Sequence, residues 1–272
     1  MAVITASQIR EYKHNGAICI RQAIDASWIA PMLEHIDTHA ATGGQGWTVE
    51  PGDRAFSDRY LWPTRDWMRA FMFESGVAEI AGRLMQSSVA RGYFDHIFVR
   101  DARTPEITPW HQDRPYWPFL GTQICSVWVA LTGCELQSSG VSFVKGSHRW
   151  DKVYKPQAFS EDDPNDEWIK QAEGEDIPDF WAHRDKYEFL DWTMEPGDAI
   201  VFGADVLHAA GRNQTNNRRR VAVSTRWLGD DAIWDPREGT DPIVTQEHVS
   251  IQPGDLAADD RAFPVGWRAD AT

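Results

Sequence analysis

The sequence has little cysteine and no long apolar run. Only Cys19, Cys125 and Cys134 occur in 272 residues, and no two have CxxC spacing. This scarcity argues against a disulfide framework and against a cysteine zinc site. The first residues, MAVITASQIREYKHNG, lack the apolar segment of a signal peptide, and no stretch approaches the roughly 18–20 apolar residues that span a bilayer. We therefore expect a protein of the reducing cytoplasm that has no membrane partner.

Positive charge is also scarce. The chain has 27 Lys and Arg against 41 Asp and Glu, which gives a formal net charge of −14. Phosphate backbones attract surfaces rich in Lys and Arg, so we expect no nucleic-acid partner and favour a small-molecule substrate. The oligomeric state stays open. Tryptophan, in contrast, is abundant at fourteen residues, which indicates a large rigid core or an aromatic pocket.

Residues 1–87 are expected to form a mostly helical shell. Thr5 and Gln8 have the spacing of a capping box, and Gly16 is a suitable residue to end this first helix. A second helix is expected to start at Asp25 and to stop at Gly43–Gly44. Apolar residues at spacings of three and four predict a third helix over residues 67–84.

Residues 88–230 have a different residue pattern, which predicts a β core. Short segments rich in β-branched and aromatic residues alternate with turn residues, which is typical of an antiparallel sandwich or barrel. These segments are residues 90–99, 123–131, 141–144, 187–194, 199–203 and 220–227. Residues 155–186 are predicted to be an insertion or lid, and residues 231–272 a C-terminal extension. We expect one domain over residues 1–272, mainly β with N-terminal α-helices.

The strongest candidate for chemistry is the HxD pair of His111 and Asp113. On an extended strand these two side chains point to the same face. His208, which ends the apolar run after a Pro-Gly-Asp turn, is the best candidate for a third ligand. Two histidines and one carboxylate form the facial triad of non-haem Fe(II) oxygenases, which leaves three positions open for a bidentate 2-oxo acid and O₂.

A 2-oxo diacid also requires a cation for its distal carboxylate, and Arg is the natural partner. Arg219 follows His208 by eleven residues, at the start of a predicted strand. Because neighbouring side chains of a strand point to opposite faces, we expect an inward Arg219 between outward Arg218 and Arg220.

Three segments carry a family resemblance. They are TPWHQDRPYWPF, SVWVALTGCELQSSGVSFVKGSHRW and EPGDAIVFGADVLHAAGRNQTNNRRRVAV. Together the sequence resembles the phytanoyl-CoA dioxygenase family of Fe(II)/2-oxoglutarate-dependent oxygenases. The resemblance implies a double-stranded β-helix, which is a distorted, cupin-like jelly roll with N-terminal helices packed outside it.

The resemblance also implies roles for individual residues. His111, Asp113 and His208 are the expected iron ligands, and Arg219 is the expected partner of 2-oxoglutarate. Two further cosubstrate neighbours are expected at Trp128 and Arg100.

The activity implied is the hydroxylation of an unactivated C–H bond in a small organic metabolite, with release of succinate and CO₂. Trp110, Tyr116 and Trp117 flank the HxD pair and are candidates for the substrate pocket. Arg226 could pair with an acidic group of the substrate if it points inward, although strand alternation directs it opposite to Arg219. The identity of the substrate, and whether it is a free metabolite or a coenzyme A thioester, stay open.

Two other functions are compatible with the motif. One is a jelly-roll protein that binds a small molecule without turning it over. The other is a zinc hydrolase, because three protein ligands and a water also suit zinc. Arg219 favours the oxygenase over both, since neither alternative needs a cation at that place.

Overall fold

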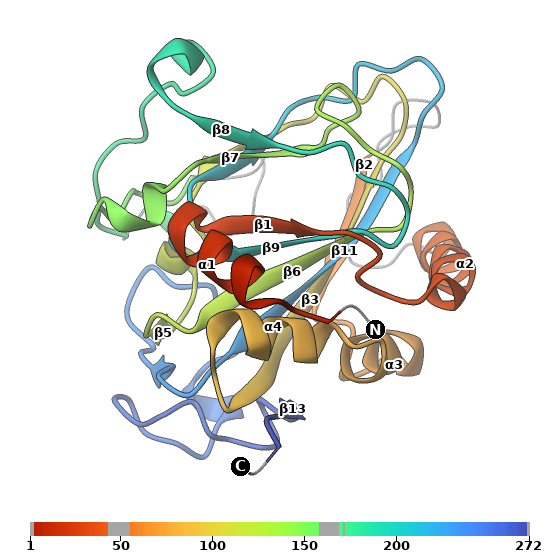
Figure 1. Ribbon diagram of the computed structural model, residues 1–272. Coiled ribbons are helices and arrows are strands. Elements are labelled where there is room, and N and C mark those ends of the chain that lie inside the picture. The colour runs from red at the N-terminus through yellow and green to blue at the C-terminus, as the bar shows by residue number, and fades with distance from the viewer. Residues whose placement is uncertain (1–2, 43–54, 158–168, 171, 271–272) are drawn as a thin grey trace.

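The computed structural model describes residues 3–42, 55–157, 169–170 and 172–270 (Figure 1). Among these residues, four α-helices lie before residue 86: α1 (Ala6–Asn15), α2 (Ile29–Ala41), α3 (Asp66–Glu74) and α4 (Val77–Met85). The strands are β1 (Ala17–Ile20), β2 (Ala55–Arg59), β3 (Val89–Arg100), β4 (Thr108–His111), β5 (Phe119–Leu120), β6 (Ile124–Ala130), β7 (Val141–Val144), β8 (Phe189–Asp191), β9 (Ala199–Gly203), β10 (His208–Ala210), β11 (Arg220–Leu228), β12 (Ile233–Trp234) and β13 (Val265–Arg268).

Two antiparallel sheets form the centre of the molecule. The larger sheet has the order β1-β9-β6-β11-β3-β13, with β2 also paired to β3, and the smaller sheet has the order β4-β10-β7-β8. Their inner faces meet in a buried cluster to which Trp128 and Phe202 come from the large sheet and Phe143 from the small one. This arrangement confirms the expected jelly roll with a mainly β core.

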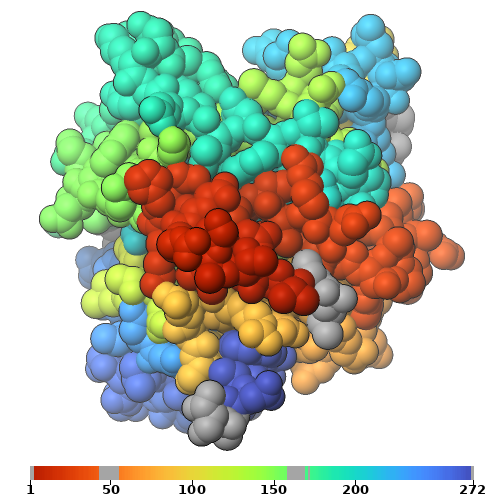
Figure 2. Space-filling model, in the orientation of Figure 1, coloured from red at the N-terminus to blue at the C-terminus, as the bar shows by residue number. Residues whose placement is uncertain are grey.

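The helices cover the outer face of the large sheet (Figures 1 and 2). Helix α1 begins and ends as predicted, because Thr5 and Gln8 form the capping box and Gly16 has a φ of 85°. The helix expected to start at Asp25 starts at Ile29 instead, because Ala26–Trp28 form a short 3₁₀ helix that is capped by Asp25 and precedes α2. The stop expected at Gly43–Gly44 lies outside the described residues.

The third predicted helix is two helices. The helix is interrupted between α3 and α4 at Ser75 and Gly76, where Gly76 adopts a φ of 94°. This left-handed conformation is open to glycine and interrupts the helical hydrogen bonds. The apolar spacing continues across the break because both helices bury the same side against the sheet. The prediction of one helix over residues 67–84 was therefore wrong.

Both faces of the large sheet are buried, and this determines which side chains reach the interior. Along β11, Val221, Val223 and Trp227 pack against the helices. The alternate residues face the small sheet, as Ala222 does in the cluster with Trp128 and Phe143. The inner face of β11 therefore carries Arg220, Ala222, Ser224 and Arg226.

The end of the chain adds a strand to the large sheet. Strand β13 pairs with the start of β3 and packs on α4. The approach is close: a Cβ on Gly82 would lie 2.2 Å from the Trp267 ring, and a Cβ on Gly266 would lie 2.6 Å from the Trp227 ring. In the part of the chain that is described, no helix has the length and apolar character that crossing a membrane requires.

Candidate metal centre

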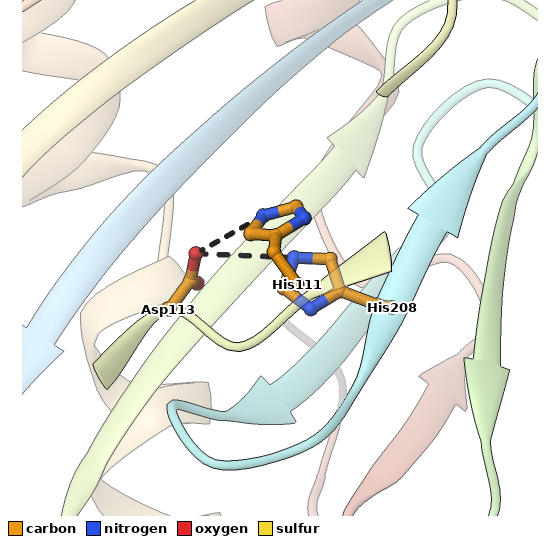
Figure 3. A group of neighbouring side chains, drawn as sticks. All are labelled: His111, Asp113 and His208. Atoms are coloured by element: carbon orange, nitrogen blue, oxygen red, sulfur yellow. Dashed lines mark ion pairs between the residues drawn. The ribbon is translucent and has the colours of Figure 1, made fainter. Parts of the chain in front are cut away.

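His111 and His208 are directly paired across two neighbouring strands of the small sheet. His111 is the last residue of β4, His208 is the first of β10, and their Cα atoms are register partners. Their ring centroids lie 4.1 Å apart. Figure 3 shows the Asp113 carboxylate pointing at both rings.

Asp113 reaches the site differently from the prediction. An extended strand was expected to put His111 and Asp113 on one face, but β4 ends at His111 and Asp113 adopts helical dihedral angles (φ −74°, ψ −36°) before a 3₁₀ turn. The chain thus turns after His111 and brings the carboxylate back toward the rings. The three side chains do meet, as predicted, but through a turn.

The donor atoms suit a metal ion. Asp113 Oδ1 lies 3.6 Å from His111 Nε2 and 3.8 Å from His208 Nε2, and one ligand atom from each residue falls within 4.8 Å of the others. These separations are too long for hydrogen bonds and leave room for an ion between the atoms. The set of two imidazoles and one carboxylate matches the facial triad that holds non-haem Fe(II).

Backbone carbonyls fix the orientation of both rings. His111 Nδ1 lies 2.8 Å from the Pro109 carbonyl and His208 Nδ1 lies 3.0 Å from the Val206 carbonyl. With Nδ1–H donating in each case, Nε2 is the nitrogen available as a ligand. Such hydrogen bonds are the usual way in which proteins set the tautomer of metal-binding histidines.

Electrostatics keep two of these residues in the form that binds metal. Burial, and then the neighbouring His111, lower the pKa of His208 to about 3, so its imidazole is neutral at neutral pH. Burial alone would raise the pKa of Asp113, but His208 and the contact with His111, helped by Arg226, bring it down to about 2. A neutral imidazole and an ionised carboxylate are the forms that ligate a cation.

Several supporting residues have no signal in the sequence. Ser126 on β6 donates a hydrogen bond of 3.1 Å to Asp113 Oδ2. Gln112 donates to the carbonyls of Lys152 and Asp205 and accepts from the Tyr154 amide, which anchors the turn that carries Asp113. Serine and glutamine are too common in β proteins for such roles to stand out in a sequence.

Arg219 does not point where it was predicted to point. Its side chain is 36% exposed and pairs with Asp37 at 2.6 Å and Asp101 at 3.3 Å. The residue directly before β11 therefore lies on the helical side of the sheet. Val221 and Val223 share that side, which is apolar because helices cover it.

Arg220 is the arginine that faces the interior. It is 2% exposed and donates to Ser139 Oγ at 3.1 Å, while its Nε and Nη1 have no hydrogen-bond partner among the described residues. Its guanidinium lies 5.7 Å from the Trp128 ring centre. Burial, and then the charge of Arg100, lower the pKa of Arg220 to about 9, so it is charged at neutral pH.

Arg100 strengthens the positive charge at this position. It is the cross-strand partner of Arg220, is itself buried, and donates to the Glu106 carbonyl and to Thr108 Oγ1. Arg220 forms no ion pair with any residue that the structure describes. A buried cation without a counter-ion is costly, so this end of the interior favours an anion.

The three aromatic residues expected to line the substrate pocket differ in position. Tyr116 lies edge-on to His111, with ring centroids 5.8 Å apart. Trp117 is edge-on to Phe94 on the inner face of β3. Trp110 packs instead with Phe180 and Leu207 on the outer face of the small sheet. Since Trp110 precedes His111 on β4, its side chain points away from the metal ligands, and the prediction for Trp110 was wrong.

The comparisons with known proteins agree with this geometry. The model of the family described as phytanoyl-CoA dioxygenase matches residues 12–221. The chain is 34% identical over 100 residues to dioxygenase cnsJ of Penicillium expansum, which covers 37% of this chain and 22% of that protein. It is 28% identical over 124 residues to a probable phytanoyl-CoA dioxygenase of Caenorhabditis elegans, in an alignment that covers 45% of this chain and 36% of that protein. The aligned regions thus span well under half of these curated relatives.

Solved structures share the fold over nearly the whole chain. The non-heme alpha ketoglutarate dependent carbocyclase SnoK from nogalamycin biosynthesis superposes with a TM-score of 0.71 at 18% identity, over 96% of both chains. The epimerase SnoN, in complex with Fe3+, alpha ketoglutarate and nogalamycin RO, superposes with a TM-score of 0.71 at 19% identity, over 95% of this chain and 97% of that one. With the family model covering most of its length and the His-Asp-His cluster in place, this chain belongs to the phytanoyl-CoA dioxygenase family.

Proposed function

We propose that this protein is an Fe(II)- and 2-oxoglutarate-dependent oxygenase that hydroxylates an unactivated C–H bond of a small organic molecule. The observation that carries the proposal is the combination of a buried His-Asp-His cluster with a buried arginine, Arg220, that has no counter-ion among the described residues. A zinc hydrolase or a protein that only binds a ligand would explain the first feature but has no use for the second.

His111, Asp113 and His208 would hold the iron, and Arg220 would bind the distal carboxylate of 2-oxoglutarate. Arginine suits this role because its planar fork pairs with both carboxylate oxygens. Arg220 takes the place that the sequence assigned to Arg219. Trp128 would lie along the cosubstrate, because its ring already contacts the Arg220 guanidinium, and Arg100 would act through its charge on Arg220.

The chain's own contribution is binding, orientation and exclusion of water. The iron and 2-oxoglutarate supply, when bound, the O₂ activation and the C–H oxidation that no side chain can perform. The protein holds the two imidazoles by backbone carbonyls and shields the ligands, each of which is less than a tenth exposed. Tyr116, edge-on to His111, would lie next to the substrate.

The test separates iron binding from turnover. Fe(II) and 2-oxoglutarate are added without oxygen, and the weak visible absorption of metal-chelated 2-oxoglutarate is recorded before O₂ is admitted and succinate is measured. We expect the absorption band first and succinate afterwards. Bound iron that gives neither signal would exclude the oxygenase and leave the zinc hydrolase and the simple binding protein as the alternatives.

A further inference from the structure

A group of polar side chains on the inner face of the large sheet lies outside the set of residues proposed to contact iron or 2-oxoglutarate. Arg59 on β2, His96 on β3 and Ser224 on β11 lie side by side in register. Arg226 follows Ser224 on the same face of β11, and Ser57 contacts the His96 ring at 3.2 Å. We call Ser57, Arg59, His96, Ser224 and Arg226 the inner basic patch.

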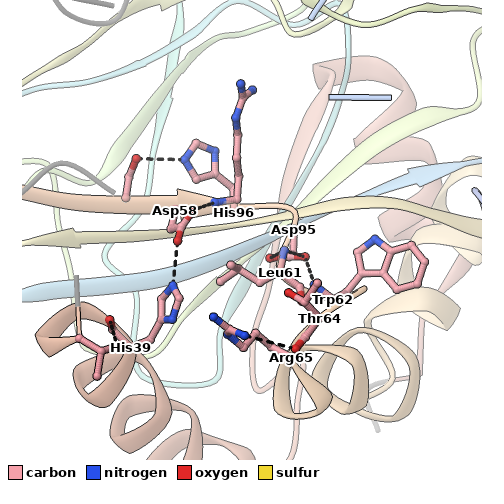
Figure 4. A network of polar contacts seen from close by, with 11 residues as sticks. His39, Asp58, Leu61, Trp62, Thr64, Arg65, Asp95 and His96 are labelled. Atoms are coloured by element: carbon pink, nitrogen blue, oxygen red, sulfur yellow. Dashed lines mark hydrogen bonds and ion pairs between the residues drawn. The ribbon is translucent and has the colours of Figure 1, made fainter. Parts of the chain in front are cut away.

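The inner basic patch faces the interior of the jelly roll, away from the helices. Figure 4 shows His96 on one side of the strands and the pair of His39 and Asp58 on the other. The His96 ring packs against Phe98, with centroids 3.9 Å apart. Burial, and then the charges of Arg226 and Arg59, lower the pKa of His96 well below its ordinary value, which agrees with three basic side chains grouped in one place.

Arg226 is the most deeply buried cation of this patch. It is 6% exposed, its Nη1 donates to the Ser224 carbonyl at 2.9 Å, and its guanidinium lies 4.5 Å from the Phe94 ring centre. Arg226 Nε, Ser224 Oγ and Tyr93 Oη are buried and find no hydrogen-bond partner in the described part of the chain. Since buried polar groups are nearly always satisfied, a ligand is the natural partner for these groups.

The carboxylates that act on Arg226 electrostatically do not form an ion pair with it. Asp113 and Asp95 both influence Arg226 electrostatically, yet neither lies within ion-pair distance of it among the described residues. Asp113 is committed to the metal. Asp95 accepts hydrogen bonds from the amides of Leu61 and Trp62, as Figure 4 shows. Arg59, in contrast, has a partner in Asp241.

Arg226 lies beside the metal ligands and far from Arg220, which is proposed to bind the distal carboxylate of 2-oxoglutarate. It is the cross-strand partner of Ser126, which donates to Asp113. Arg220 is six residues away on the same face of β11, or about 20 Å of strand. The two arginines are therefore separate cationic positions, and the distal carboxylate of 2-oxoglutarate can use only one of them. Arg226 is therefore left for a second anion near the metal.

We propose that Arg226 binds a carboxylate of the substrate, so that the substrate class is a small organic acid. Ser224 Oγ and Tyr93 Oη would complete the hydrogen bonds to that carboxylate, and Phe94 with Trp117 would contact its apolar part. This inference rests on the proposed function, because it assumes that 2-oxoglutarate occupies the Arg220 end of the interior.

The experiment compares acids with their uncharged analogues. Benzoate, phenylacetate and cinnamate are each titrated against their primary amides by anaerobic calorimetry, on protein that is saturated with Fe(II) and 2-oxoglutarate. We expect at least one acid to bind with a dissociation constant at least tenfold lower than its amide. Arg226→Gln should remove that preference, Arg226→Lys should keep part of it, and Arg268→Gln, a change of an exposed arginine, should leave it intact.

The outcomes separate this inference from the proposed function. The 2-oxoglutarate titration comes first, so its failure would count against the proposed function, and the acids would still be titrated on the iron-loaded protein. If no acid binds better than its amide, or if Arg226→Gln keeps the preference, Arg226 is not a substrate carboxylate site. Should Arg226→Gln fail to fold, Arg226→Lys is compared with the wild type instead. We then expect the preference of Arg226→Lys for the acid over its amide to be at least fivefold smaller than that of the wild type.

Discussion

Arg219 and Arg220 are neighbours in the chain, but their guanidinium groups lie on opposite sides of the large sheet. Arg219 pairs with Asp37 and Asp101 on the helical side, whereas Arg220 lies in the interior against Trp128 and Ser139. The two residues thus form a matched pair for experiments. Arg219 has counter-ions near solvent, and Arg220 lies in the interior, where the described residues offer it none.

Substitution of these two arginines should separate cosubstrate binding from stability. Arg220→Gln removes the cation proposed to hold the distal carboxylate, so we expect the dissociation constant for 2-oxoglutarate to rise about 100-fold, or about 2.7 kcal/mol. Arg219→Gln should change it less than about threefold, because exposed ion pairs contribute little. Anaerobic titration of the iron-loaded variants measures both. An equal effect of the two substitutions would contradict the assignment of Arg220.

Removal of one imidazole should abolish the metal site without unfolding the protein. His208→Ala leaves two protein ligands. Substitution of a residue that only hydrogen-bonds to a ligand typically lowers metal affinity about 10–100-fold, and the loss of a ligand itself should lower it further. Because an ion that binds only the folded state stabilises it, Fe(II) or Zn(II) should raise the melting temperature of the wild type. We expect no such rise for His208→Ala and a full one for His14→Ala, which changes an exposed histidine of α1. A metal-dependent rise that survives in His208→Ala would place the ion elsewhere.

Ser126→Ala tests the support of the carboxylate ligand. Its hydroxyl donates to Asp113 Oδ2, the oxygen that is farther from the histidines. Loss of this hydrogen bond should lower iron affinity about tenfold and leave the dissociation constant for 2-oxoglutarate of the iron-saturated protein close to that of the wild type. Competition with a chelator measures the iron affinity, and calorimetry measures the dissociation constant for 2-oxoglutarate. Ser88→Ala, a change far from the iron ligands, is the control, and an unchanged affinity in Ser126→Ala would show that Asp113 needs no such support.

Asp259 gives a stability prediction that is independent of the metal site. Its carboxylate accepts from the Ser250 amide and hydroxyl and from the amides of Arg261 and Ala262. Burial alone would raise its pKa, but these hydrogen bonds lower it to about 2. Asp259→Asn should therefore lower the free energy of unfolding by about 2 kcal/mol at pH 7, whereas Asp260→Asn, an exposed neighbour, should change it by less than about 0.5 kcal/mol.

The pH dependence of this contribution has a definite sign. The unfolded carboxylate takes up a proton near its ordinary pKa of 3.8, while the folded one stays ionised down to about pH 2. The stabilisation by Asp259 is thus complete above about pH 5 and is lost as the pH falls toward 2. Denaturant unfolding of wild type and Asp259→Asn at pH 7, 4 and 2.5 measures the difference in their free energies of unfolding. A difference between them that stays constant over this range would refute the role of the carboxylate.

The sequence predicted the elements whose patterns are local. Thr5, Gln8 and Gly16 define α1 by themselves, and the β-branched runs of β3, β6, β9 and β11 are long enough to stand out. The two- and three-residue strands β5, β10 and β12 were missed, because they are stabilised by pairing with distant segments and have no periodicity of their own. The break at Gly76 was missed for a related reason: the apolar spacing continues across it.

The site shows the same division. The HxD motif and the distal histidine identify the cluster of His111, Asp113 and His208, because those residue types have few other uses at such spacing. The direction of Arg219 was wrong because alternation tells which residues share a face and cannot tell which of two buried faces is the interior. Val221 and Ala222 are both apolar and buried, so the distinction depends on where the helices pack.

The pairing of His111 with His208 determines when, during synthesis, the chain can first bind a metal ion at this site. The two histidines lie on different strands that belong to distant parts of the chain, so no local segment emerging from the ribosome holds the complete set of ligands. The site arises only when β10 has been made and has docked beside β4. Under the proposed function, iron can therefore bind in full coordination only to a chain that has already formed this sheet.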